Sequence, residues 1–258
     1  MKLNIIYNKT ISDYKNILNQ IEEMLINKGV DFQSFDIDNM QNFGEISLVI
    51  GGDGTLLKAA KFYSDFAVPV LGINIGRLGF LSQGSNILDI IENVVNKNFS
   101  VEERLMLVSD NKIALNDFVI KGCNSSRTSK FYLEINGECV CDYIADGLII
   151  ATPTGSTAYG LSAGGPVIYP TMDAIVIVPI CPHTLNARPL VVPSTEIITI
   201  KTSENLLAVS NDGFEAKTCV EKITIKACET KALLAFLKAG EFYKVLRDKL
   251  HWGISEAK

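Results

Sequence analysis

One aspartate lies among three glycines in the segment Gly51-Gly52-Asp53-Gly54-Thr55. The apolar run Ile46–Ile50 precedes it and Leu56-Leu57 follows it, so the segment should link a strand to the start of a helix. The glycines permit positive φ and leave backbone N–H groups open to a phosphate, which a helix N-terminus also attracts. A carboxylate repels phosphate unless it takes a proton from a nucleophile or meets a metal ion. This combination predicts phosphoryl transfer with Asp53 as the catalytic residue.

A second glycine-rich segment, Asp146–Pro166, offers hydroxyl groups, free amides and one aromatic ring close to the middle of the sequence. The sequence contains no G-x-x-x-x-G-K-[ST] and no G-x-G-x-x-G after a strand. A simple P-loop or Rossmann enzyme is therefore disfavoured. The two histidines, His183 and His251, form no cluster, so no transition-metal site is expected.

Composition narrows the possible partners. With 258 residues, 47% hydrophobic and 21% charged, the chain can bury one large core or two modest ones. Its net charge of −5 gives no basic surface for nucleic acid or an anionic membrane. The opening residues do not form a signal peptide and no apolar run is long enough to span a membrane, so we expect a cytoplasmic protein.

The cysteines show no zinc-site spacing, and a chain of this length does not need disulfides to fold. For Cys139 and Cys141, which would share one face of a strand, reduced structural thiols are the expected state. The remaining cysteines are Cys123, Cys181, Cys219 and Cys228.

The elements that must position Asp53 alternate between short apolar runs and helical patterns, which predicts an α/β domain over residues 1–100. We expect strands over 3–7, 47–50 and 68–73. Helices are expected up to Gly29, which would close the first one, and over 55–63. A ligand should then bind at the carboxyl end of the strand that leads into Gly51.

From about Val101 the pattern changes to alternating, β-branched segments, which predicts an all-β domain over 101–230. Asn136-Gly137 predicts a hairpin between strands at 131–135 and 138–143. Further strands are expected over 118–120, 147–151, 174–178, 197–201 and 222–227. The segment 231–258 should pack back on one of the domains.

Several segments together resemble the NAD kinase family. Gly51–Thr55 alone is shared with diacylglycerol kinases and, more loosely, with phosphofructokinases, but its combination with Thr152–Tyr159 is highly specific. The segments in question are Gly51–Thr55, Gly72–Leu81, Leu115–Asp117, Asp146-Gly147, Thr152–Tyr159, Ser162–Pro166 and Asp212-Gly213.

The resemblance implies an amino-terminal open α/β domain and a carboxy-terminal β-sandwich-like domain that enclose a dinucleotide. It implies transfer of the terminal phosphoryl of ATP, or of polyphosphate, to the 2′-hydroxyl of the adenosine ribose of NAD. Asp53 would be the general base, and Mg²⁺ or another divalent cation would arrive with the phosphate donor. A homodimer or homotetramer is implied, in which Asp146 reaches the site of a neighbouring subunit.

The resemblance also implies binding roles for particular residues. Asn116 and Asp117 match an Asn-Glu pair that binds NAD, although Asp117 is one methylene shorter than Glu. The segment Thr157–Ser162 matches the residues that meet the adenosine. The implied substrate- and nucleotide-binding residues are Gly51, Gly52, Gly54, Thr55, Lys58, Phe80, Asn116, Asp117, Arg127, Asp146, Thr157, Ala158, Tyr159, Gly160, Leu161 and Ser162.

Simpler readings stay open for several of these residues. Asp53 fits a turn or helix cap, Asn116-Asp117 an Asx turn, and Tyr159 a core aromatic. Asp146 fits a turn at a strand end, and the two basic residues Lys58 and Arg127 fit solvated surface charges.

Two alternative functions also stay open at this point. One is a lipid or sugar kinase that shares the glycine-rich segment, and the other is a non-catalytic sensor of NAD or NADP. Ile144 stands where many family members carry a basic residue, and Phe214 where a polar residue is common. Selectivity between NAD and NADH, feedback by NADP and the preferred donor are therefore not decided by the sequence.

Overall fold

A computed structural model describes residues 1–74, 79–83, 86–123, 128–184, 186–202, 206–213, 219–238 and 241–252 of the chain. The chain forms two compact units. One comprises Met1–Glu103 and Ala232–Lys258, and the other comprises Arg104–Lys231. The carboxy-terminal segment thus contributes to the same unit as the amino terminus.

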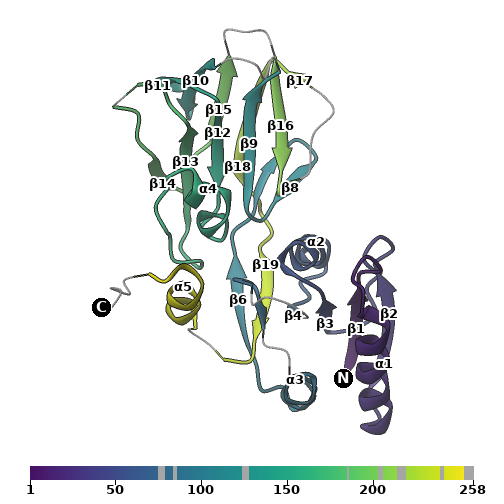
Figure 1. Cartoon of the computed structure of the whole chain (residues 1–258). Coiled ribbons are helices and arrows are strands. Elements are labelled where there is room, and N and C mark those ends of the chain that lie inside the picture. The colour runs from purple at the N-terminus through teal and green to yellow at the C-terminus, as the bar shows by residue number, and fades with distance from the viewer. Residues whose placement is uncertain are drawn as a thin grey trace, which may run out of the picture. The chain divides into compact units, whose positions relative to one another are not determined.

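The first unit is built on a seven-stranded sheet with the order β2-β1-β3-β4-β19-β6, and β5 pairs with β4 (Figure 1). Strands β1 to β4 are mutually parallel, and β19 adds to β4 in the same direction. The strands are β1 (Lys2–Tyr7), β2 (Asp31–Asp36), β3 (Ile46–Ile50), β4 (Val70–Ile73), β5 (Ser82–Gln83), β6 (Ser100–Arg104) and β19 (Ala232–Phe236). Strand β3 is buried at every residue and is apolar except for Ser47, whose hydroxyl accepts a hydrogen bond from Asn4 Nδ2 at 3.0 Å, as suits a central parallel strand.

Helices pack on this sheet through apolar positions at helical spacing. Helix α1 (Tyr14–Asn27) buries Ile21 and Leu25, and α3 (Ile87–Val95) buries three residues against the same core. The chain leaves α1 through Gly29, whose φ of +65° suits glycine, so the predicted helix end is confirmed. The other helices of this unit are α2 (Asp53–Ser64) and α5 (Phe242–Leu250).

The second unit consists of two six-stranded sheets that share one apolar core, as in a β-sandwich. Their orders are β11-β10-β15-β18-β7-β8 and β14-β13-β12-β9-β16-β17 (Figure 1). The strands are β7 (Leu107–Ser109), β8 (Lys112–Ala114), β9 (Asp117–Gly122), β10 (Ser129–Ile135), β11 (Glu138–Ala145), β12 (Gly147–Ala151), β13 (Ala174–Ile180), β14 (Leu190–Pro193), β15 (Ile198–Thr202), β16 (Leu207–Asn211), β17 (Cys219–Val220) and β18 (Lys222–Ala227).

Alternation along β9 decides which side chains can reach a ligand. Phe118 and Ile120 point into the sandwich core, so Val119 and Lys121 lie on the opposite face of the sheet. A short 3-10 helix η1 (Gly155–Thr157) and helix α4 (Tyr159–Ser162) follow β12 in the chain. Ala163, immediately after α4, packs with Val119 in a second apolar cluster.

Most sequence-based boundaries agree with the observed strands to within two residues. The Asn136-Gly137 hairpin is confirmed: both residues have positive φ, and Ile135 pairs with Glu138. Among the two-residue differences, α2 begins at Asp53 where a start near Thr55 was expected, and β4 begins at Val70 where Val68 was expected.

Cys123 and Cys219 form a disulfide that joins positions 96 residues apart. The sequence reasoning did not anticipate this bond, because no local pattern links two cysteines so distant in the chain. The other four cysteines, including Cys139 and Cys141, are free thiols. Within the described residues, no helix has the length and apolar character needed to cross a membrane.

Candidate functional site

Asp53 is the first residue of α2 and follows the buried strand β3 by two glycines. Gly52 caps the helix in an extended conformation, with φ −85° and ψ −177°. Asp53 is partly exposed and Gly52 and Gly54 are exposed. The carboxylate therefore sits at the positive end of a helix and at the carboxyl edge of a parallel sheet, where α/β proteins bind their ligands.

Two backbone N–H groups hold the Asp53 carboxylate. Phe80 N donates to Oδ2 at 2.9 Å, and Leu81 N donates to Oδ1 at 3.4 Å. A Cβ built on Gly79 would lie 1.8 Å from Asp53 Oδ1, so this approach requires glycine. The contacts explain why Gly79-Phe80-Leu81 accompanies Asp53 in the sequence: its backbone orients the acid. The motif residues 75–78 lie outside the described part of the chain.

Gly51, Gly52 and Gly54 do not use the positive φ that glycine permits, since none of them adopts the left-handed region. At Gly51 the requirement is steric, because a Cβ would lie 2.6 Å from the Cβ of Thr55. At Gly52 and Gly54 a Cβ would meet nothing within 4 Å. The absent side chains there leave the backbone at the helix start exposed, which is what an approaching phosphate needs.

Two side chains of α2 are held by residues from neighbouring strand ends. Thr55 Oγ1 accepts a hydrogen bond of 3.3 Å from Asn8 Nδ2, just after β1. Lys58 Nζ pairs with Asp38 Oδ1 at 2.6 Å, and both side chains are well exposed. Lys58 is thus a paired surface charge near the start of α2.

In the second unit, Asn116 and Asp117 stand where the chain enters β9. The segment after β12 packs on their backbone: Thr152 N donates to Asn116 O at 2.8 Å, and Thr152 Oγ1 donates to Leu115 O at 2.6 Å. A Cβ on Gly155 would lie 2.1 Å from Asn116 O. The Thr-Pro-Thr-Gly sequence therefore serves close backbone packing against the Asn-Asp pair.

Asp212 holds the same pair from the other side. Its carboxylate accepts hydrogen bonds from Leu115 N, Asn116 N and Asp117 N at 3.0, 2.7 and 3.2 Å. Asp212 N donates in return to Asp117 O at 3.0 Å. The sequence reasoning named Asp212 as part of a motif and gave it no role, because it lies 95 residues from Asp117.

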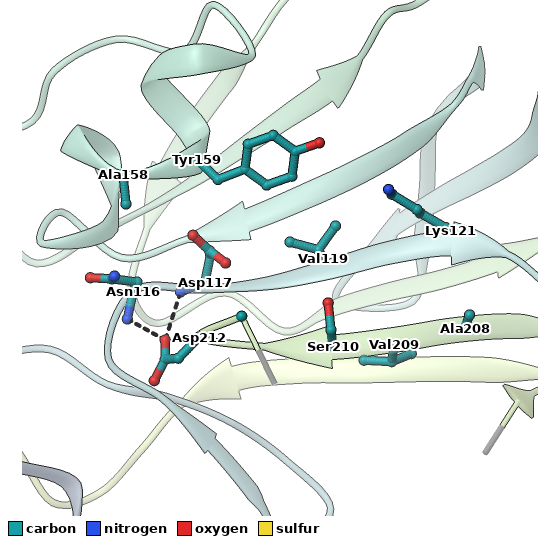
Figure 2. A pocket seen from close by; sticks show the side chains of 11 residues that line it. Asn116, Asp117, Val119, Lys121, Ala158, Tyr159, Ala208, Val209, Ser210 and Asp212 are labelled. Atoms are coloured by element: carbon teal, nitrogen blue, oxygen red, sulfur yellow. Dashed lines mark hydrogen bonds between the residues drawn. The ribbon is translucent and has the colours of Figure 1, made fainter. Parts of the chain in front are cut away.

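Asn116, Asp117 and Asp212 border a pocket of about 660 Å³ (Figure 2). Figure 2 shows Asp117, Val119 and Lys121 leaving β9 toward the side on which Tyr159 lies. The described lining residues are Asn116, Asp117, Val119, Lys121, Ala158, Tyr159, Ala208, Val209, Ser210, Asp212 and Gly213. A pocket of this size with mixed apolar and polar walls suits part of a nucleotide.

Charge in the pocket centres on Asp117. Burial, reinforced by the Asp212 carboxylate, raises the pKa of Asp117 to about 7. The group therefore changes protonation near neutral pH, and can accept or donate a hydrogen bond. Lys121 supplies a cation among the described lining residues, four positions further along β9.

The structure brings four of the expected binding residues to this pocket: Asn116, Asp117, Ala158 and Tyr159. Tyr159 is 41% exposed, so the reading as a core aromatic was wrong. The expected residues Thr157, Gly160, Leu161 and Ser162 lie on η1 and α4, beside the pocket rather than among its described lining. Gly160 packs close to Ala151 of β12.

Asp146 is exposed between β11 and β12 and is not among the described lining residues. Its backbone N donates to Ile180 O at 2.9 Å. Ile144, on β11, is 40% exposed. Arg127 and Phe214 lie outside the described residues.

Sequence reasoning missed the pocket residues on β9 and β16. Val119 pairs with Ser210 and Lys121 with Ala208, so these four form one patch of sheet surface. The alternation of β9 after Asn116-Asp117 contains the signal for Val119 and Lys121. No local signal identifies β16 as the neighbouring strand. Among the described residues, no group of three or more His, Cys, Asp or Glu side chains is placed to hold a metal ion.

Two family models match the chain. The ATP-NAD kinase N-terminal domain matches residues 9–99, and the ATP-NAD kinase C-terminal domain matches residues 115–237. Together they cover most of both compact units.

Similar proteins named NAD kinase align with most of this chain and with most of their own length. An NAD kinase of Pseudomonas putida is 41% identical over 225 residues, covering 81% of this chain and 76% of that protein. An NAD kinase of Clostridium botulinum is 35% identical over 271 residues, covering 97% and 95%.

Among solved structures, an NAD kinase from Archaeoglobus fulgidus in complex with ATP is similar, with a TM-score of 0.79 and 27% identity. The match covers 97% of this chain and 99% of the Archaeoglobus fulgidus chain. A yeast NADH kinase complexed with NADH shares the fold, with a TM-score of 0.83, 23% identity, and coverage of 100% and 90%.

Proposed function

Since this chain belongs to the NAD kinase family and phosphorylates NAD, we propose that Asp53 is the base that accepts the proton of the reacting hydroxyl. The observation that carries this proposal is the arrangement of the Asp53 carboxylate, held by Phe80 N and Leu81 N at the start of α2. A carboxylate fixed in this way keeps one orientation and still has lone pairs for a substrate hydroxyl. If Asp53 only capped the helix, its carboxylate would not need glycine at position 79.

In the proposed reaction, the 2′-oxygen of the adenosine ribose attacks the terminal phosphorus of the donor. The bond from that phosphorus to its bridging oxygen breaks, and the hydroxyl proton passes to Asp53. A carboxylate is a weak base toward an alcohol, so the proton moves late, when bonding to phosphorus has acidified the hydroxyl. Positioning then supplies much of the rate enhancement.

The proposed donor site is the exposed backbone of Gly52 and Gly54 at the start of α2, with Gly51, Thr55 and Lys58 beside it. ATP is the donor we propose first, because the Archaeoglobus fulgidus relative was solved in complex with ATP. Polyphosphate is the second candidate. Mg²⁺ or a similar ion would come bound to the donor phosphates, since Mg²⁺ usually keeps phosphate and water ligands.

The pocket of the second unit is the proposed dinucleotide site. Asn116 offers an amide and Asp117 a carboxyl group to the hydrogen-bonding edges of the ligand, while the exposed Tyr159 ring offers a stacking surface. Lys121 is suited to a phosphate of the dinucleotide. These features favour a nucleotide over a lipid or sugar acceptor, and the relatives named above are NAD kinases rather than sensors.

Selectivity between NAD and NADH is left to the acceptor assay described below, because Ile144 departs from the family pattern. Ile144 cannot make the charged contact that a basic residue makes at this position in many family members. Phe80, an expected nucleotide-binding residue, donates its backbone N–H to Asp53.

We propose further that the enzyme is a cytoplasmic homodimer or homotetramer, with Asp146 acting in the site of a neighbouring subunit. The exposure of Asp146 away from the described lining of its own pocket supports this proposal. Mixing Asp53→Asn and Asp146→Ala proteins tests it. Hybrid oligomers should regain activity, because one site then combines an intact Asp53 with an intact Asp146. Mixtures that stay as inactive as their parents would contradict it.

The test of the reaction is an assay of the wild-type protein with Mg²⁺ and a panel of donors, with NAD and NADH as acceptors. We expect NADP from NAD and ATP, with phosphorus NMR placing the new phosphate on the 2′-oxygen. Phosphorylation of a lipid or sugar with NAD untouched would overturn the assignment, and tight NADP binding without turnover on any donor would favour a sensor.

A further inference from the structure

Asp212 directly follows strand β16, which ends at Asn211, and its backbone lies in the left-handed region, at φ +49°. Aspartate tolerates this conformation better than most residues. The turn directs its carboxylate at the backbone of Leu115–Asp117, where it accepts the three N–H bonds given above. Figure 2 shows two of these bonds, to the backbone of Asn116 and Asp117.

The Asp212 carboxylate supplies hydrogen-bond acceptors at the point where the pairing of β9 with β16 stops. The β9–β16 ladder ends with the pair Phe118 and Asn211. Beyond it, the N–H groups of Leu115 and Asn116 find their acceptor in Asp212 rather than in a strand backbone. Hydrogen bonds to a charged acceptor are about twice as strong as neutral ones. One side chain therefore holds this segment on the side where the β9–β16 ladder has ended, while β12 and Thr152 hold its other side.

We propose that Asp212 is a positioning residue of the dinucleotide pocket. It sets the backbone that presents the Asn116 and Asp117 side chains to the ligand. The inference rests on the proposed function of that pocket. Asp212 acts through its neighbours, so its loss should weaken binding of the dinucleotide more than it slows the chemical step.

The Asp212 charge also influences Asp117 directly. Among the described lining residues, three ionisable groups share the pocket with Asp117: Asp212 just after β16, Lys121 on β9 and Tyr159 on α4. Because a like charge disfavours ionisation, replacing Asp212 with a neutral residue should lower the pKa of Asp117. A structural defect alone would not move the pH profile in this direction.

The experiment compares Asp212→Asn with wild type, using steady-state kinetics across pH and calorimetric titration with NAD. Asparagine keeps the shape but offers one oxygen and no charge. We expect at least a tenfold rise in KM for NAD, with KM for the donor within about twofold of wild type. In the pH profile of kcat/KM, the acidic limb should shift to lower pH. Asp110→Asn is the matched control, because Asp110 is exposed in the β7–β8 turn at the same φ of +49°.

An unchanged KM for NAD in Asp212→Asn, or an acidic limb that stays in place, would overturn the inference. If Asp212→Asn does not fold, Asp212→Glu replaces it. Glutamate keeps the charge but displaces the acceptor by one methylene, so KM for NAD should still rise while the acidic limb stays fixed. A fixed KM in that variant would also contradict the inference.

A double-mutant cycle with Asn116→Ala separates this inference from the proposed function. Coupled, non-additive effects on NAD affinity are expected if Asp212 acts through Asn116. Additive effects would reject Asp212 as the positioning residue while the pocket remains the NAD site. Wild-type protein that does not bind or phosphorylate NAD would instead reject the proposed function itself.

Discussion

Gly79 lies directly against Asp53: a Cβ at residue 79 would fall 1.8 Å from Asp53 Oδ1 and 2.4 Å from its Cγ. The two residues are brought together by the bonds from Phe80 N and Leu81 N to the same carboxylate. The glycine thus provides the room in which the acid is oriented. Since Asp53 is proposed as the base, Gly79, a residue without a side chain, should control the rate.

Gly79→Ala tests this relationship. The added methyl must displace either the carboxylate or the backbone that holds it, and a misplacement of about 1 Å can cost roughly 100-fold in rate. We therefore expect kcat to fall about 100-fold, with KM for NAD close to wild type. Steady-state kinetics and thermal unfolding should be measured on the same preparation.

Gly137→Ala is the control for a general loss of stability. Gly137 has φ +84° in the exposed β10–β11 turn, and a Cβ there meets nothing within 4 Å. Alanine should cost about 1 kcal/mol of stability through its strained backbone and leave kcat unchanged. A Gly79→Ala enzyme as active as Gly137→Ala would show that the Asp53 orientation does not limit the reaction.

The raised pKa of Asp117 predicts how stability depends on pH. Its folded-state pKa of about 7 lies above the ordinary value of 3.8, so the folded protein binds this proton more tightly than the unfolded chain. The resulting stability is fully present below about pH 4 and lost as pH rises through about 7. At about 1.4 kcal/mol per pKa unit, ionised Asp117 costs the ligand-free protein on the order of 4 kcal/mol above that range.

Asp117→Asn should remove this pH dependence. The ligand-free variant is expected to match wild type near pH 4 and to unfold at a higher temperature than wild type at pH 8. Asp110→Asn, at an exposed acid, should show no such divergence. Parallel stability curves for Asp117→Asn and wild type from pH 4 to 8 would contradict the assigned protonation.

Thiol counting tests the Cys123–Cys219 bond. Under denaturing, non-reducing conditions, four of the six cysteines should react with a thiol reagent. Cytoplasmic proteins rarely keep disulfides. The Cys123–Cys219 bond and the cytoplasmic location expected from the sequence therefore predict opposite redox states for these two cysteines inside the cell. Six reactive thiols in oxidised, purified protein would exclude the bond.

Local sequence predicted the parts of the fold that depend on neighbours in the chain. Strand β3, the end of α1 at Gly29 and the Asn136-Gly137 hairpin follow from apolar runs and from residues that accept positive φ. Asp53 was identified in the same way, because its glycines and its helix are adjacent to it.

Features that depend on distant contacts could not be predicted in this way. The bond from Asp117 N to Asp212 spans 95 residues, and the Cys123–Cys219 disulfide spans 96. Strand β19 joins the sheet of the first unit only after the whole second unit has been completed. Strand β2, with the sequence Asp-Phe-Gln-Ser-Phe-Asp, is a polar edge strand without a strong apolar pattern.

The most direct test of the mechanism is kcat for Asp53→Asn with NAD, ATP and Mg²⁺. Asparagine can accept the bond from Phe80 N but cannot take the hydroxyl proton, so folding and the KM for NAD should stay close to wild type. Loss of a general base typically lowers the rate by about 10²- to 10⁴-fold, and we expect kcat to fall by at least about 10²-fold. Turnover equal to that of the wild type would show that Asp53 is not the base.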